Sequence, residues 1–206
     1  MVRVLIIGNS KFPSNAITET LVENSNMIIA CDGAIEQCID KSLEVDYVIG
    51  DMDSLNNISI RDLEQLNLQV IKIEDQNDND LSKSINFACD LGAKQIDIIG
   101  VEGGSNQHQF ASYWSLLDCP IESYIHLEDS IVSTIDCSSA SYSIEIGGTF
   151  SVFPIGHCKG VCVSGSKWVV DNEEINPSSR GLHNVAIERE IEISCRDGQL
   201  LIFRSR

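Results

Sequence analysis

The sequence predicts an α/β fold in which an N-terminal, mostly parallel sheet with helices on both faces is followed by a C-terminal antiparallel β-sandwich or barrel. Apolar, strand-like runs alternate with helical patterns up to about residue 127. Strands that are apolar throughout are typical of a parallel sheet covered on both faces. Beyond this point the strand-like segments alternate polar and apolar residues or are separated by turn residues, which is typical of antiparallel sheets. We therefore predict two domains, residues 1–128 and 129–206.

In the first domain, strand-like runs alternate with segments of helical spacing. The run "VRVLIIGN" near the start is too short for the apolar core of a signal peptide, so we predict a strand there. Ser14 is the predicted N-cap of the first helix, and Gly92 is the predicted stop of the fourth. The predicted strands cover residues 2–9, 27–33, 47–54, 69–75 and 95–104, and the predicted helices cover residues 14–25, 34–40, 60–67, 80–93 and 108–118.

The second domain is predicted to contain strands only. Its last segment holds "RDGQ", residues 196–199, between two alternating runs. Because Asp-Gly is a common hairpin turn, we predict that residues 188–203 form a β-hairpin. The strand-like segments of this domain cover residues 130–136, 141–146, 149–156, 160–170 and 185–203.

The composition restricts the class of partner. The 206 residues include 31 acidic and 14 basic side chains, which gives a net charge of −17. A surface this negative repels phosphate backbones, so we expect no nucleic-acid partner. No apolar run is long enough to cross a membrane, so we expect no membrane partner. The eight cysteines form no C-x-x-C pair and mostly lie in apolar patterns, which predicts buried, reduced thiols and a cytoplasmic location.

Acidic residues follow several strands of the first domain. Asp32 follows one strand, Asp51 and Asp53 follow the next, and residues 75–80 contain three more acids. The carboxyl ends of parallel strands lie along one edge of a sheet, so we expect these acids to meet there. Neighbouring carboxylates resist ionisation unless a cation is present, and oxygen ligands suit Mg²⁺. The pattern predicts a metal site, although a lone Asp-x-Asp is a weak signal and Asp80 alone is also a good helix N-cap.

A glycine turn follows the last predicted strand of this domain. Gly103 and Gly104 lie in "VEGGSNQH", between a strand and a helix. Such a turn lets backbone N–H groups approach a phosphate at a helix N-terminus, and a tight turn without a ligand is the alternative. The Walker, Gly-x-Gly-x-x-Gly and Gly-x-Ser-x-Gly motifs are all absent from the sequence. The four histidines, none at metal-ligand spacing, are His108, His126, His157 and His183.

Together these motifs resemble those of the thiamine pyrophosphokinase family. The family's "GDFDS" motif is closely matched by "GDMDS", residues 50–54, and its "DxDxTD" motif is matched by residues 75–80. The similarity runs through nearly the whole chain in the family's order. The other matches, to the family's "ADGG", "GGRxDH", "GLKW" and "GxSN" stretches, lie at residues 31–34, 103–108, 165–168 and 181–184.

The resemblance implies ATP-dependent pyrophosphoryl transfer to thiamine, giving thiamine diphosphate and AMP. It implies Mg²⁺ as cofactor, bound by Asp51, Asp53 and Asp80 as the catalytic residues, one of which could also accept the proton of the thiamine hydroxyl. It also implies a homodimer whose all-β domain contributes to thiamine binding and dimerisation. The residues implied for ATP binding are Asp32, Gly33, Lys83, Gly103, Gly104, Ser105 and His108. Those implied for thiamine binding are Gln76, Trp168, His183 and Asn184.

Among the positions that depart from the family's motifs, three bear on substrate recognition or catalysis. Ser105 replaces an Arg, Gln107 replaces an Asp and His183 replaces a Ser. Loss of the Arg removes a rigid donor for phosphate or base recognition. One alternative is therefore an impaired homologue that binds nucleotide or thiamine without turnover, and another is a metal-dependent nucleotide-sugar transferase, because that class also uses Asp-x-Asp. At single positions, Trp168 could instead be a core residue and Lys83 a solvated helix lysine.

Overall fold

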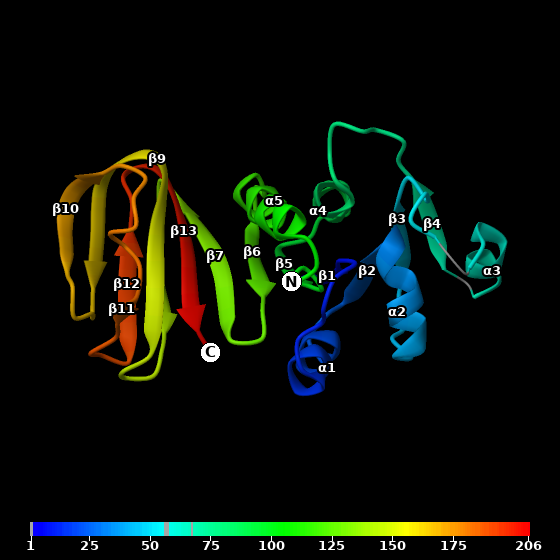
Figure 1. Cartoon of the computed structure of the whole chain (residues 1–206), viewed down its shortest axis with the longest axis horizontal. Coiled ribbons are helices and arrows are strands. Elements are labelled where there is room, and N and C mark those ends of the chain that lie inside the picture. Colours follow the sequence, from blue (N-terminus) through cyan, green and yellow to red (C-terminus); the bar gives the residue numbers. More distant parts are fainter. Residues whose placement is uncertain (1, 56–57, 67) are drawn as a thin grey trace. The chain divides into compact units, whose positions relative to one another are not determined.

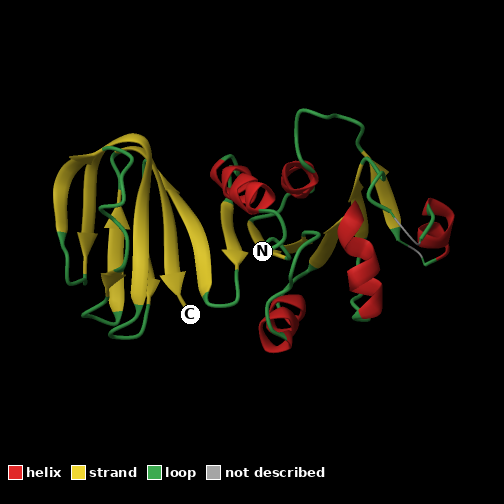
Figure 2. Ribbon diagram, in the orientation of Figure 1, coloured by secondary structure: helices red, strands yellow, loops and turns green. Residues whose placement is uncertain are grey.

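The computed structural model describes residues 2–55, 58–66 and 68–206, so that Asn67 of the third predicted helix lies outside the described residues. The chain divides into two compact units, Met1–Glu128 and Asp129–Arg206. The prediction of a mixed α/β chain is confirmed (Figures 1 and 2). Within the described residues, no helix combines the length and the apolar character needed to cross a membrane.

The first unit contains a parallel sheet with strand order β4-β3-β2-β1-β5-β6. Helices connect its strands, because parallel strands need crossover connections. The strands are β1 (Arg3–Ile7), β2 (Met27–Cys31), β3 (Tyr47–Gly50), β4 (Gln69–Lys72), β5 (Gln95–Ile99) and β6 (Glu122–His126). The helices are α1 (Asn15–Glu23), α2 (Ile35–Asp40, after the short turn η1, Asp32–Ala34), α3 (Ile60–Gln65), α4 (Asp80–Asp90) and α5 (Asn106–Leu117).

Helices cover both faces of this sheet, as the apolar strands require. On one face, Leu5 of β1 packs in the same buried cluster as Leu21 of α1 and Ile35 of α2. On the other face, α4 lies against β2, where the Cys31 Sγ is 3.7 Å from the Ser84 Oγ. Burial of apolar side chains from both directions fixes the sheet, and therefore fixes the edge at which its strands end.

β6 is a strand that the sequence analysis does not predict. Polar side chains interrupt its sequence, "ESYIH", which therefore lacks the continuous apolar pattern of β1 and β2. The polar residue His126 is nevertheless buried, because its Nε2 lies 2.6 Å from the Asp97 Oδ1 on β5. Pairing with an internal partner allows a polar residue to occupy a buried strand position.

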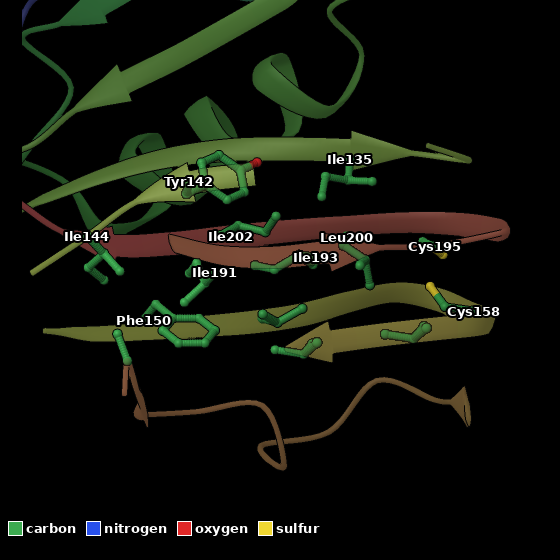
Figure 3. Packing of buried hydrophobic residues seen from close by; sticks show 14 residues of the cluster. Ile135, Tyr142, Ile144, Phe150, Cys158, Ile191, Ile193, Cys195, Leu200 and Ile202 are labelled. Atoms are coloured by element: carbon green, nitrogen blue, oxygen red, sulfur yellow. The ribbon is translucent and has the colours of Figure 1, made fainter. Parts of the chain in front are cut away.

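The second unit is antiparallel, with strand order β7-β13-β9-β12-β8 and with β10 and β11 also paired to β9. Apolar side chains from these strands pack together in one core (Figure 3). Phe150, Ile193 and Leu200 contribute side chains that are almost fully buried. The strands are β7 (Ser130–Asp136), β8 (Ser139–Ser143), β9 (Thr149–Ser164), β10 (Val170–Ile175), β11 (Asn184–Val185), β12 (Glu190–Ser194) and β13 (Asp197–Ser205).

The predicted hairpin over residues 188–203 is wrong. The described pairs of β12 are with β8 and β9, whereas those of β13 are with β7 and β9. At the turn, the backbone N–H of Cys195 donates to the carbonyl of Ser138, and that of Arg196 donates to the carbonyl of Lys159. The two strands therefore follow one another along the chain but form no described pairs with each other. Both still bury apolar residues in the same core.

Residues 149–164 form the single strand β9 instead of the two segments that the sequence predicts, 149–156 and part of 160–170. The first part of β9 pairs with β13 and the last part pairs with β10 and β12. Gly156 and Gly160 lie between these parts at φ values of +76° and +64°. Glycine adopts such angles without strain, so the strand changes partners here without ending.

All eight cysteines are free thiols. The prediction of burial is confirmed for Cys31, Cys38, Cys158 and Cys195, and it is wrong for Cys137, which is exposed. Burial raises the pKa of both Cys31 and Cys38 to about 12. These two thiols therefore stay protonated at neutral pH and act as small apolar side chains.

Candidate functional site

Three carboxylates meet at the carboxyl ends of β2 and β3. Asp32 follows β2, and Asp51 and Asp53 follow β3. The two strands are parallel neighbours, with Cys31 paired to Ile49. One carboxylate oxygen from each of the three acids lies within 4.8 Å of the others. Parallel pairing therefore brings together acids that are about twenty positions apart in the sequence.

Asp32 is the buried member of this acidic group and is 1% exposed. Its Oδ1 accepts a hydrogen bond of 2.6 Å from the backbone N–H of Gly33, and its Oδ2 accepts one of 2.8 Å from that of Met52. A Cβ at Gly50 would lie 2.4 Å from the Asp32 Cγ. The absence of a side chain at Gly50 is therefore what allows the Asp32 carboxylate to pack across the end of β3.

Two acids of this group, Asp32 and Asp51, have pKa values that are shifted in opposite directions. Burial raises the pKa of Asp32, and the negative charge of Asp80 raises it further. In contrast, the Gln76 amide, which donates to the Asp51 Oδ2 at 2.9 Å, lowers the pKa of Asp51. The backbone N–H of Asp53 donates to the Asp51 Oδ1 and acts in the same direction. The result is a concentration of negative charge that a divalent cation would relieve.

Asp80 lies outside the group of three, although the sequence places it there beside Asp51 and Asp53. It is the first residue of α4, and the N-cap is Asn79, whose Oδ1 accepts from the backbone N–H of Ser82. The Asp80 Oδ1 lies 3.0 Å from the Lys83 Nζ. Asp80 nevertheless remains within electrostatic range of Asp32. The interpretation of Asp80 as an N-cap is therefore wrong, and its side chain instead forms an ion pair.

Lys83 is 5% exposed, so the interpretation of it as a solvated helix lysine is wrong. Burial disfavours its charged form, but the hydrogen bond and the charge of Asp80 outweigh this and raise its pKa. The charges of Asp51 and Asp32 act in the same direction. Lys83 is therefore a fixed cation close to the acidic group.

The glycine turn lies between the carboxyl end of β5 and the start of α5, at the edge of the sheet where β2 and β3 also end. Gly103 and Gly104 have φ values of +77° and +66°, in the region that favours glycine. The backbone N–H of Gly103 donates to the Gln109 Oε1 at 3.2 Å. Ser105 is the N-cap of α5 but makes no side-chain capping bond, and His108 is exposed on the first turn.

The segment that follows β1, residues 8–11, contacts the site, although the sequence does not predict a role for it there. The backbone N–H of Lys11 donates to the carbonyl of Glu102 at 3.0 Å, which ties this segment to the glycine turn. The Asn9 amide lies against Gly33, where an added Cβ would be 2.2 Å from the Asn9 Nδ2. The signal was present in the sequence, because Gly8 and three polar residues follow the apolar run of β1 just as acids follow β2 and β3.

The thiamine-binding residues that the resemblance implies in the second unit lie near a cavity of about 480 Å³. Trp168 and Asn184 line it together with aliphatic residues and the basic residues Lys167 and Arg180. Trp168 is 53% exposed, so its interpretation as a core residue is wrong. His183 has an exposed side chain, a φ of +63° and a backbone N–H that donates to the Ser151 Oγ. Gln76 belongs to the first unit, where it binds Asp51.

Comparisons with known proteins agree with these features. The structure is similar to that of thiamine pyrophosphokinase from Bacillus subtilis, with a TM-score of 0.83 and 17% identity over 98% of each chain. It is also similar to thiamin pyrophosphokinase from Geobacillus thermodenitrificans, with a TM-score of 0.84 and 18% identity over 100% of this chain and 98% of the other. For the enzyme from Candida albicans, the TM-score is 0.81 and the identity is 16%, over 100% and 89% of the two chains.

A comparison with curated proteins found no match. The family model "Thiamin pyrophosphokinase, catalytic domain" matches residues 18–127, which is more than half of the chain and includes the acidic group and the glycine turn. The chain therefore belongs to the thiamin pyrophosphokinase family.

Proposed function

We propose that this protein transfers a pyrophosphoryl group from ATP to the hydroxyl of thiamine, giving thiamine diphosphate and AMP. The observation that supports this best is the group of three carboxylates, Asp32, Asp51 and Asp53, in a chain of this family. Pyrophosphoryl transfer depends mainly on positioning and on neutralising charge. An edge of the sheet that bears both acids and a buried lysine suits that task.

The acidic group fits a Mg²⁺ ion. Its ligands would be hard oxygens, which Mg²⁺ prefers, and they already lie within 4.8 Å of one another. Burial and the charge of Asp80 raise the pKa of Asp32, so a cation beside the group would favour its ionised form. We propose Asp51 and Asp53 as ligands, with Asp32 or Asp80 nearby as a third carboxylate. When bound, Mg²⁺ would neutralise part of the charge on the polyphosphate of ATP.

The remaining residues of this edge would hold the polyphosphate and accept the proton. Lys83 offers a buried ammonium group whose position Asp80 fixes. The turn at Gly103 and Gly104, with Ser105 and His108 beyond it, lies at the N-terminus of α5, where the helix dipole favours anions. The thiamine hydroxyl would attack the β-phosphorus as AMP leaves, and one ionised carboxylate of the acidic group would accept the hydroxyl proton.

We also propose that the second unit binds thiamine and forms a cytoplasmic homodimer. Trp168 and Asn184 at the cavity, and His183 beside them, would line the site for thiamine, which Gln76 would face across the homodimer interface. The exposed Trp168 ring supports this role, because an aromatic face attracts a cation such as the thiazolium ring. The net charge of −17 also favours a cationic acceptor over an anionic one.

The direct test is to incubate the protein with ATP, Mg²⁺ and thiamine and to separate the products by chromatography. We expect AMP and thiamine diphosphate in equal amounts. Calorimetric binding of ATP or thiamine without AMP would instead support the impaired homologue that Ser105, Gln107 and His183 suggest. Consumption of a nucleotide sugar, with ATP left intact, would support the transferase alternative.

Two variants connect this activity to the acidic group. Asp53→Asn should lower turnover by about 100-fold or more, because it removes a proposed ligand while keeping the shape of the side chain. Glu19→Gln removes one negative charge from the exposed surface of α1 and should leave turnover unchanged. An Asp53→Asn variant as active as the parent protein would refute the proposed role of Asp53.

A further inference from the structure

The side-chain amide of Asn184 makes all of its hydrogen bonds with other groups of the protein. Its Oδ1 accepts from the backbone N–H groups of Trp168 at 3.1 Å and Val185 at 2.9 Å. Its Nδ2 donates to the carbonyl of Trp168 at 2.8 Å and to the Ser166 Oγ at 3.1 Å. An asparagine amide has two acceptor sites and two donor hydrogens. All four are used here, and the side chain is 8% exposed.

These bonds hold the turn that carries Trp168. Asn184 binds both the backbone N–H and the carbonyl of Trp168, and the Ser166 Oγ, which is buried, also donates to that carbonyl. The backbone N–H of Lys167 donates to the carbonyl of Val185 at 2.9 Å. The backbone of the turn is thus fixed from one side, while the Trp168 ring projects at the cavity and is 53% exposed.

The contrast between a fixed backbone and an exposed ring points to a ligand. An exposed tryptophan contributes little to the stability of the fold. A rigid one, however, offers a preformed surface for stacking, because little conformational entropy remains to be lost when a ligand binds. The Lys167 Nζ lies 4.6 Å from the centre of the Trp168 ring. This contact indicates that a ring face of Trp168 already attracts a cation.

We propose that Asn184 is a positioning residue that holds Trp168 as one wall of the thiamine site and does not itself bind thiamine. To contact thiamine, the amide would have to break one of its four internal bonds. The identity of the ring that stacks on Trp168 rests on the proposed function, but the fixing of Trp168 by Asn184 does not. The proposal replaces the role in substrate contact that the family resemblance implies for Asn184.

The proposal predicts a specific kinetic signature. Loss of the Asn184 amide leaves the backbone polar groups of Trp168 without these partners, so the turn should become mobile. A wall that contacts thiamine equally in the ground state and in the transition state affects binding and not the chemical step. Asn184→Ala should therefore raise the KM for thiamine by about tenfold and leave kcat within about twofold.

The experiment uses the full chain with Trp114→Phe, which leaves Trp168 as the sole tryptophan. Fluorescence anisotropy and acrylamide quenching then report on Trp168 itself. In Asn184→Ala we expect lower anisotropy and stronger quenching, and in Asn184→Asp, which keeps the acceptors but loses the donors, an intermediate effect. Ile135→Val, in the core of the same unit, is the control and should change neither signal.

The fluorescence measurements test the role of Asn184, whereas turnover of thiamine tests the proposed function, so either can fail without the other. Unchanged anisotropy and quenching in both Asn184 variants would overturn it, whether or not the protein uses thiamine. A fall in kcat at constant KM would also overturn it, because that result assigns Asn184 to the chemical step. If Asn184→Ala does not fold, Asn184→Asp provides the same readings. If the parent protein does not turn over thiamine, the proposed function fails and the fluorescence measurements still decide the role of Asn184.

Discussion

Asp32 reaches the acids after β3 because Gly50 has no side chain. In Gly50→Ala the new methyl group would lie 2.4 Å from the Asp32 Cγ, so the carboxylate would have to move. We expect the free energy of unfolding to fall by about 1–3 kcal/mol, as is typical of overpacking. Metal affinity should fall as well, because Asp32 leaves its position near Asp51 and Asp53. Urea denaturation and a Mn²⁺ titration measure the two effects.

Gly147→Ala separates the two effects of Gly50→Ala. Gly147 has a φ of +90° and no atom within 4 Å of an added Cβ, so alanine there is strained but clashes with nothing. It should destabilise the protein and leave metal affinity unchanged. If Gly50→Ala behaves in the same way, Gly50 does not position Asp32.

At the residue scale, the sequence predicts which strand ends carry the site better than it predicts which atoms meet. The sequence predicts that Asp51 and Asp53 lie together, because they follow one strand. It places Asp80 with them but does not reveal that the Asp80 carboxylate pairs with the buried Lys83 Nζ. Side-chain direction depends on such partners, which no spacing rule supplies. The direct neighbour of the pair is Asp32, whose approach to Asp51 and Asp53 the strand ends do predict.

Among the elements, β1, β5 and β6 are joined by a buried ionic cluster. Asp97 of β5 is fully buried and contacts both the guanidinium of Arg3 on β1 and the imidazole of His126 on β6. Burial alone would raise the pKa of Asp97, but the hydrogen bonds from His126 and Arg3 outweigh it and hold the pKa of Asp97 below its usual value. The ionised form is therefore the one that stabilises the folded sheet.

Asp97→Asn should lower the free energy of unfolding at pH 7 by about 3–5 kcal/mol, because it removes the buried counter-ion of the partly buried Arg3 guanidinium and the charged acceptor at His126. The pKa of Asp97 is lowered by folding, so its contribution is complete above the unfolded-state value of about 4 and is lost as the pH falls through the folded-state value. The difference in free energy of unfolding between the parent protein and Asp97→Asn should therefore decrease below about pH 4. Urea denaturation at pH 7, 5 and 3.5 measures this, and a difference that stays constant would contradict it.

At the element scale, the sequence predicts local patterns well and partner choice poorly. The apolar runs β1 to β5 and their helices follow from periodicity. β6 does not, because the burial of its histidine depends on Asp97 of another strand. The failed hairpin has a similar cause, since β12 and β13 both match the long strand β9. Whether β12 and β13 pair with each other or with β9 depends on the packing of the whole core. A local turn motif carries no information about that packing.

At the scale of the whole molecule, exposed apolar side chains of the second unit offer a surface for the proposed homodimer. Trp168, Val169 and Leu182 all line the cavity and are more than half exposed. Leu182→Glu should weaken the dimer, because it would bury a charge at the interface. Sedimentation velocity at micromolar concentration measures this, with Leu91→Glu in the first unit as the control. A monomeric parent protein, or a variant that dimerises unchanged, would contradict the proposal.

Mn²⁺ binding in the presence of ATP tests most directly the claim that carboxylates from separate parts of the chain form one divalent-cation site. Free Mn²⁺ can be counted by its paramagnetic resonance signal, and it accepts the same oxygen ligands as Mg²⁺. Asp51→Asn combined with Asp53→Asn should weaken binding by about 100-fold or more. The pair Glu19→Gln and Glu23→Gln, which removes the same charge from the exposed surface of α1, should bind like the parent protein. Equal weakening in both pairs, or none in the first, would contradict the claim.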